Sequence, residues 1–300
     1  MKNRPAIFLA VALVLLVAFS ADAKKLRIGV SLLPYYSFAA NIVKDRADIV
    51  PLIENGVNTH GYRITPEDVK RASSLDAVII NGVGHDEFAL DIIKAAGIEK
   101  SAHIIYANKE VALLPQSQSD NSVNSHTFVS ITASIQQIYT IANELGAIDP
   151  ANAQFYRQNS MAYVQRLRQM KASALKQIAA CGNVDLRCAT VHGAYSYLLS
   201  DFGFQIQDVV ENVHGIEPSA ARLRNVSEQI KKHGVKILFV ETDFPSPFVA
   251  TIRKETGVKT FGLSHLSQGE YRADFFERAI QADIDTICEA VKAIKGVSVK

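Results

Sequence analysis

Short apolar runs alternate with helical patterns along this chain, and that alternation constrains the fold more than any other feature of the sequence. In the first half, β-branched runs bounded by Gly, Pro or Asn predict strands, and the stretches between them have helical spacing. One helix start is especially clear, because Thr65-Pro66-Glu67-Asp68 combines an N-cap residue, a first-turn proline and two acidic residues. The predicted strands cover residues 26–33, 49–53, 77–83 and 103–107, and the predicted helices cover 36–44, 65–74 and 87–96. This order predicts a mainly parallel sheet covered by helices.

A much longer helical pattern follows the first half. After a helical stretch at 131–145, Asp149-Pro150 opens a pattern whose apolar residues recur mostly every three or four positions until about Ala180, and Gly182 is placed to end it. A helix of about 30 residues is about 45 Å long, which is enough to run along two lobes. Beyond it the alternation resumes, with predicted strands at 188–191, 206–210, 236–241 and 258–263 and predicted helices at 194–202, 219–233, 247–256 and 271–293.

We therefore expect an α/β protein with two similar lobes, each built on a mainly parallel sheet. The predicted parts are an N-terminal lobe over residues 24–148, one long linking helix over 149–181 and a C-terminal lobe over 182–300. In open α/β sheets, ligands bind outside the carboxyl ends of the strands. Two lobes bridged by a helix would therefore have a ligand cleft between them.

The N-terminus has the pattern of an export signal. Lys2 and Arg4 precede an apolar run at 6–19, and Ala21-Asp22-Ala23 has the small-x-small pattern of a signal-peptidase site. The run is shorter than the roughly 20 apolar residues that span a bilayer, although an uncleaved anchor is the alternative. We therefore predict a cleaved signal peptide over 1–23 and an exported protein without a lipid anchor, since no cysteine lies at the junction. The net charge of +2 gives no electrostatic footprint for nucleic acid.

The cysteines argue against a cysteine-based metal site. The chain has three, and none forms a C-x-x-C motif. In an oxidising compartment, Cys181 and Cys188 could pair across a short turn that contains Gly182, whereas Cys288 lies in an apolar helical pattern and is expected to be a buried thiol. Any metal must therefore be held by histidine and carboxylate.

Three of the eight histidines lie in loops next to predicted strands or helices. His60 follows the strand at 49–53, His126 precedes a helix, and His192 ends the strand at 188–191. They are separated by 66 and 66 residues, so only the fold could bring them together, across the cleft. Neutral imidazole suits zinc, which favours four ligands in a tetrahedron. The alternative for each histidine alone is a cap, a solvated side chain or a hydrogen-bonded polar group, and we rank the other histidines, including His85 in a polar loop, below these three.

Several ordered motifs resemble one family, the zinc- and manganese-binding receptors of bacterial ABC importers. The similar segments span almost the whole chain after residue 23, and they are Asn58-Thr59-His60-Gly61-Tyr62 with Thr65-Pro66-Glu67-Asp68-Val69, Asn81-Gly82-Val83-Gly84, Val123-Asn124-Ser125-His126, His192-Gly193-Ala194-Tyr195, Glu217-Pro218-Ser219 and Phe239-Val240-Glu241. The resemblance implies two lobes joined by a rigid helix, modest lobe motion, and His60, His126 and His192 as metal ligands.

The resemblance also points to a fourth ligand, but this chain departs from the family there. The family often has an aspartate after the last strand, and this sequence has Leu263-Ser264-His265-Leu266 instead. We expect His265 to complete the site, because zinc accepts imidazole as readily as carboxylate. Water and Glu241 are the alternatives.

The implied function is capture of a divalent metal ion in the periplasm and its delivery to the membrane permease of an ABC importer, by a monomeric, non-enzymatic receptor. Three or four histidines favour zinc, since manganese-type members mix two histidines with two carboxylates, although histidine also suits copper and nickel. The segment 113–122 lacks the histidine-rich loop of many zinc-specific members.

Two other functions are compatible with parts of the sequence. A zinc hydrolase would need a general base, for which Glu241 or Asp243 could serve, but the usual hydrolase motifs His-Glu-x-x-His and Gly-x-Ser-x-Gly do not occur. A receptor of the same fold for a chelated metal or a small organic ligand, or an adhesin, is the second alternative. Tyr35, Tyr36, Phe38 and Tyr62 could then line a pocket, or simply pack in the core.

Overall fold

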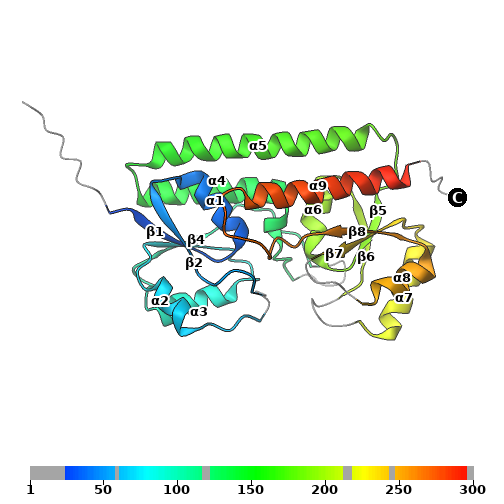
Figure 1. Cartoon of the computed structure of the whole chain (residues 1–300), viewed down its shortest axis with the longest axis horizontal. Helices are drawn as coiled ribbons and strands as arrows, with labels where there is room; N and C mark the ends of the chain where they lie inside the picture. The colour runs from blue at the N-terminus through cyan, green and yellow to red at the C-terminus, as the bar shows by residue number, and fades with distance from the viewer. Residues whose placement is uncertain (1–23, 58–60, 117–121, 212–217, 243–246, 296–300) are drawn as a thin grey trace, which may run out of the picture.

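The computed structural model describes residues 24–57, 61–116, 122–211, 218–242 and 247–295. It contains two lobes side by side, each with a four-stranded sheet, beneath a long helix (Figure 1). Every strand pair recorded in the two sheets is parallel, and helices cover the sheets. The predicted fold class, two α/β lobes joined by one long helix, is confirmed.

The N-terminal lobe follows the predicted order of elements. Its sheet has the strand order β2-β1-β3-β4. Its elements are β1 (Leu26–Val30), α1 (Leu33–Val43), β2 (Ala47–Pro51), α2 (Pro66–Ala72), β3 (Ala77–Ile80), α3 (Glu87–Ala95), β4 (His103–Tyr106) and α4 (Ile131–Ile148). The first strand is shorter than predicted, because Leu33 and Pro34 already form the first turn of α1. Proline is tolerated there because it has no backbone N–H, and the N–H groups of a first turn have no partner within the helix. The capping box predicted at Thr65 and Asp68 is present.

The C-terminal lobe repeats the same strand order, β6-β5-β7-β8. Its elements are β5 (Arg187–Thr190), α6 (Ser196–Asp201), β6 (Gln205–Val209), α7 (Ala220–Lys232), β7 (Ile237–Glu241), α8 (Val249–Thr256), β8 (Lys259–Leu263) and α9 (Phe275–Ile294). In both sheets the strand order reverses direction around the first strand of the lobe. The crevice at such a reversal is where ligands bind in α/β proteins.

One long helix joins the lobes, and a second helix packs beneath it. The helix α5 (Ala153–Ala179) runs along both lobes as predicted, and α9 lies beneath it, beginning beside α1 and running over the C-terminal lobe (Figure 1). Arg166 of α5 ties them together, since its Nη2 donates to Asn41 Oδ1 of α1 at 2.8 Å and its Nε donates to Glu277 Oε1 of α9 at 2.8 Å. This three-helix contact favours small relative motions of the lobes. The exact boundaries between the linking helix and the two lobes, at residues 148/149 and 181/182, stay a prediction.

The apolar residues form one large core that runs from the first sheet through α4, α5 and α9 to the second sheet, and a smaller core beneath α7 and α8. Tyr35 and Phe38, which could have lined a ligand pocket, belong to the large core. Phe38 packs edge-on against Phe276 of α9. The rings of Tyr35 and Phe38 therefore pack in the core.

The cysteines differ from one of the predictions. All three are free thiols, so the suggested Cys181–Cys188 pairing is wrong in this structure. Cys188 is enclosed in the core within β5, while Cys181 follows α5 at a partly exposed position. Cys288 is a buried thiol, as expected.

The predicted export segment, residues 1–23, lies outside the described residues. Among the described residues, no helix combines the length and the apolar character needed to cross a membrane.

Candidate metal centre

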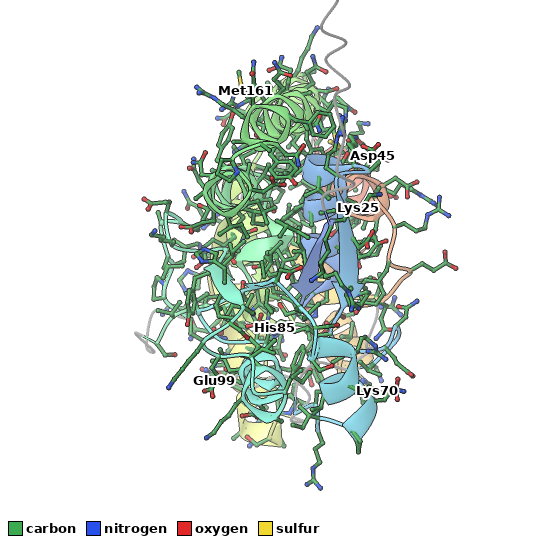
Figure 2. All side chains as sticks on the ribbon, turned by 90° about the vertical axis from the view of Figure 1, so that its left-hand side faces the viewer. Lys25, Asp45, Lys70, His85, Glu99 and Met161 are labelled. Carbon is green, nitrogen blue, oxygen red and sulfur yellow. The ribbon has the colours of Figure 1, made fainter. Side chains whose placement is uncertain are left out.

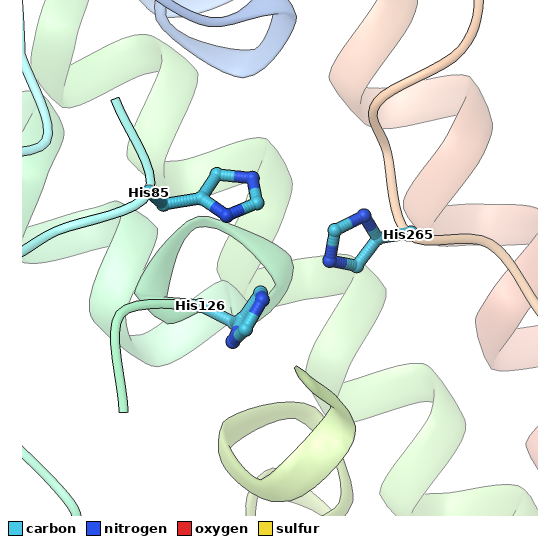
Figure 3. Close-up of side chains that lie close together, drawn as sticks. All are labelled: His85, His126 and His265. Atoms are coloured by element: carbon cyan, nitrogen blue, oxygen red, sulfur yellow. The ribbon is translucent and has the colours of Figure 1, made fainter. Parts of the chain in front are cut away.

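Four histidines from four different loops meet between the lobes. His85 follows β3 and His126 precedes α4 in the N-terminal lobe, while His192 follows β5 and His265 follows β8 in the C-terminal lobe. All four side chains are buried, and His265 is fully enclosed. Figure 3 shows the rings of His85, His126 and His265 turned toward one another. Each lobe therefore contributes two imidazoles to one cluster.

The distances within the cluster are those of a possible ligand set. Ligand atoms of His85, His126 and His265 all lie within 4.8 Å of one another. The Nε2 atoms of His126 and His192 are 3.3 Å apart. Two nitrogens at neighbouring corners of a tetrahedral zinc site are separated by about 3.3–3.4 Å, given Zn–N bonds of about 2.0–2.1 Å. The His126–His192 pair thus already has the spacing of two ligands to one ion.

His85 is held in an unusual backbone conformation. Its φ is 78°, in the left-handed region, and it follows Gly82 and Gly84, whose φ values are also positive. A residue with a Cβ is uncommon in this region, although histidine occurs there more often than most. Such strained residues cluster at functional sites. This conformation, together with the ring contacts to His126 and His265, marks His85 as a candidate ligand.

Asp86 holds the His85 loop against the sheet. Its carboxylate accepts hydrogen bonds from Ser31 Oγ at 2.5 Å and from the backbone nitrogen of Asn81 at 2.6 Å. Burial raises the pKa of Asp86 to about 6, and these hydrogen bonds only partly offset that effect. The loop is therefore fixed by a buried acid directly beside the cluster.

His265 and Glu241 occupy the same corner of the site. Glu241 ends β7, and its Oε1 lies 4.0 Å from His265 Nδ1. Ser267 Oγ lies 3.4 Å from the same ring nitrogen. The two protein candidates for the fourth ligand are therefore neighbours, and a carboxylate beside a ligating histidine can also orient its ring.

A small cavity adjoins the cluster. It has a volume of about 20 Å³, about enough for one water molecule, and His85, Phe128 and Tyr271 contribute to its walls. The segment 54–57 lines it as well. His60, the first of the predicted ligands, comes three residues after this segment and lies outside the described residues.

The structure thus brings three of the predicted ligands together, His126, His192 and His265, and adds His85. The sequence contained a signal for His85, which we had ranked below His60, His126 and His192. It follows the end of a parallel strand, as His192 and His265 do, and the carboxyl ends of neighbouring parallel strands lie at one edge of a sheet. Figure 2 views the molecule from the side of the N-terminal lobe, and it shows His85 near the middle of the molecule, with Lys70 and Glu99 closer to its edge.

Comparisons with known proteins agree with this architecture. A family model described as the periplasmic component A of the zinc-uptake complex matches residues 28–290. The chain is 26% identical over 261 residues to the high-affinity zinc uptake system protein ZnuA of Bacillus subtilis (strain 168), covering 82% of this chain and 81% of that protein.

Two solved structures are more similar in sequence. The solute-binding protein FpvC from Pseudomonas aeruginosa in complex with Mn²⁺ is 46% identical, with a TM-score of 0.85 over 90% of this chain and 99% of that chain. The same protein in complex with Ni²⁺ is 47% identical, with a TM-score of 0.83 over 92% and 99% of the two chains.

Proposed function

This chain belongs to the family of periplasmic zinc-uptake component A proteins, and from that premise we propose that it is a receptor that captures a divalent metal ion and delivers it to an ABC importer. The single observation that carries the site is the meeting of four buried imidazoles between the lobes, with His126 and His192 Nε2 atoms at 3.3 Å. We assign the ligand role to His85, His126, His192 and His265. His60 and Glu241 are further candidates for the same ion.

The proposed site works by enclosing the ion between the lobes. Neutral imidazoles donate lone pairs, so binding needs no buried negative charge, and any proton on a ligating nitrogen is released when the ion binds. Because His85 and His126 come from one lobe and His192 and His265 from the other, the ion would link the two lobes. Release to a permease would then require only a small separation of the lobes.

We propose zinc as the favoured metal. Imidazole suits zinc, copper and nickel, whereas manganese prefers oxygen ligands. Relatives are named for zinc, and the two FpvC structures hold Mn²⁺ and Ni²⁺, so the fold accommodates several divalent ions. A site made mainly of histidine should rank zinc and nickel above manganese.

A receptor fits better than a zinc hydrolase. A catalytic zinc site keeps one position for water next to three protein ligands, and four imidazoles would fill a tetrahedral site. We therefore propose no catalytic role for Glu241.

The cellular setting proposed here follows from the family and the N-terminal pattern. Residues 1–23 would be a cleaved signal peptide, the mature chain a periplasmic monomer, and its partner the membrane permease of an ABC importer.

The test is metal content by mass spectrometry after native purification, followed by competitive titration of the mature chain with zinc, nickel and manganese. We expect about one ion per chain and zinc binding tighter than manganese binding. At a zinc concentration 100 times its Kd, the free energy of unfolding should rise by about 2.7 kcal/mol. The receptor function would be refuted if the purified chain held no metal and if added metal did not raise its melting temperature.

A further inference from the structure

The side chain of Asn124 lies between two of the proposed ligand loops. Its Oδ1 accepts a hydrogen bond from the backbone nitrogen of His126 at 3.1 Å and lies 2.9 Å from His126 Nδ1. Its Nδ2 donates to the carbonyl oxygen of Gly193, the residue after His192, at 2.8 Å. The side chain is completely buried, so solvent does not compete for these bonds. One amide thus contacts both a ring and a loop of the cluster.

Two backbone groups fix which way this amide points. A backbone N–H can only donate and a backbone carbonyl can only accept. The His126 nitrogen therefore requires the oxygen of the Asn124 amide on its side, and the Gly193 carbonyl requires the NH₂ group on the other. The usual ambiguity of asparagine orientation does not arise here.

The orientation of the amide decides the tautomer of His126. Because Oδ1 can only accept, the Nδ1 atom that lies 2.9 Å from it must carry the proton. In the neutral imidazole the lone pair is then on Nε2, the atom that faces His192 Nε2 at 3.3 Å. Asn124 thus prepares His126 to bind a metal through Nε2.

The same amide connects the lobes, and a tyrosine reinforces the connection. Tyr197 Oη of α6 donates to the Asn124 carbonyl oxygen at 2.9 Å and accepts from the Leu114 backbone nitrogen at 2.8 Å. A Cβ on Gly193 would lie only 3.4 Å from Gln116 Nε2, so the two chain segments approach closely. The loop that carries His126 is therefore attached to the loop that carries His192 before any ion binds.

We propose that Asn124 is a positioning residue that holds His126 in its Nε2-ligating tautomer and joins the His126 and His192 loops into one preformed unit. This proposal rests on the metal-receptor function proposed above. Outer groups of this kind typically change metal affinity 10- to 100-fold.

Aspartate and alanine would separate the two tasks of Asn124. In Asn124→Asp a carboxylate oxygen still accepts from His126, but the other oxygen would face the Gly193 carbonyl and repel it. In Asn124→Ala both contacts are lost, and both tautomers of His126 become accessible. Tyr197→Phe is the matched control, because it removes hydrogen bonds from the same loop without touching the His126 ring.

The experiment compares wild type with these three variants. Long-range ¹H–¹⁵N NMR of the metal-free, ¹⁵N-histidine-labelled proteins, at a pH above the titration of histidine, reports which nitrogen of His126 carries the proton. Competitive titration with zinc alone gives the affinity.

We expect the Nδ1–H signature in wild type, Asn124→Asp and Tyr197→Phe, and its loss in Asn124→Ala. Zinc affinity should fall at least about 10-fold in Asn124→Ala relative to Tyr197→Phe, and Asn124→Asp should bind zinc more weakly than wild type.

The proposal is overturned if Asn124→Ala keeps the signature or binds zinc as well as Tyr197→Phe. Should Asn124→Ala not fold, the isosteric Asn124→Asp decides, since wild-type affinity in that variant would refute the link to Gly193. If wild type binds no metal, the receptor function fails, while the NMR comparison still decides the tautomer.

Discussion

The Nε2 atoms of His126 and His192 lie 3.3 Å apart, although the residues are 66 positions apart in the sequence and belong to different lobes. The helices α1, α5 and α9 contact one another and connect the two lobes, which favours this spacing. A site that is already assembled loses less free energy to ordering when its ligand binds. We therefore expect this protein to bind its ion with small rearrangements.

The first prediction concerns these two histidines. His126→Ala and His192→Ala should each weaken zinc binding at least about 10-fold, since each removes a proposed direct ligand and the loss of an outer group alone typically costs that much. The double variant should lose less than the product of the two factors, because both residues act on one ion. Competitive zinc titration measures this. His103→Ala is the control, since His103 lies elsewhere beside Glu144 and its loss should leave the affinity unchanged. If the double variant lost the full product of the two factors, so that the binding free energies were additive, the two residues would have separate roles.

The second prediction separates His265 from Glu241. His265→Ala should weaken zinc binding strongly, whereas Glu241→Gln, which keeps the shape of the side chain, should have a smaller effect through the orientation of His265. Zinc titrations of both variants, with melting temperatures of the metal-free proteins, provide the comparison. Unchanged affinity in His265→Ala would remove that residue from the ligand set, and a larger loss in Glu241→Gln would make the carboxylate the fourth ligand.

The third prediction uses the strained backbone of His85. His85→Gly removes the imidazole but accepts the positive φ, whereas His85→Ala removes the imidazole and keeps the strain. The glycine variant should be more stable than the alanine variant by about 1 kcal/mol, and both should bind zinc at least about 10-fold more weakly than wild type. Chemical denaturation of the metal-free proteins and zinc titration test the two parts. Wild-type affinity in both variants would show that His85 is a structural residue.

The fourth prediction is a pH dependence that originates at Asp86. Its pKa rises from the ordinary value near 3.8 to about 6 in the folded protein, because burial disfavours the charged form. The folded state therefore binds the proton more tightly than the unfolded state, so this stabilisation is complete below the ordinary pKa. It is lost as the pH rises through about 6. Two pKa units correspond to roughly 3 kcal/mol as an order of magnitude.

Asp86→Asn removes this titration and provides the test. The free energy of unfolding of wild type minus that of Asp86→Asn, measured by denaturant titration of metal-free protein, should fall by about 2–3 kcal/mol between pH 4 and pH 7.5. Subtraction cancels the titration of other groups. A difference that does not vary with pH would contradict the raised pKa.

Much of this fold could be predicted from local patterns. The eight strands and the helix that ends at Ala179 correspond to predicted elements because strand runs, caps and glycine ends are encoded in adjacent residues. His126 and His192 were also recognisable, since each follows or precedes a regular element at the sheet edge where ligands bind, whereas His265 was suggested by the family resemblance alone. The Cys181–Cys188 pairing that the sequence allowed is absent, because closeness in sequence does not determine which way a buried strand residue points.

The sequence by itself therefore determined two parallel α/β lobes, a long helix between them and histidines at the ends of their strands, because these depend on periodicity and on neighbouring residues. Only the tertiary structure decided which histidines meet. The left-handed backbone at His85 was not anticipated from the sequence, and the shared corner of His265 and Glu241 and the fixed amide of Asn124 depend on contacts between segments that are separate in the chain. The Asn124–Gly193 contact crosses from one lobe to the other, and no local spacing encodes it.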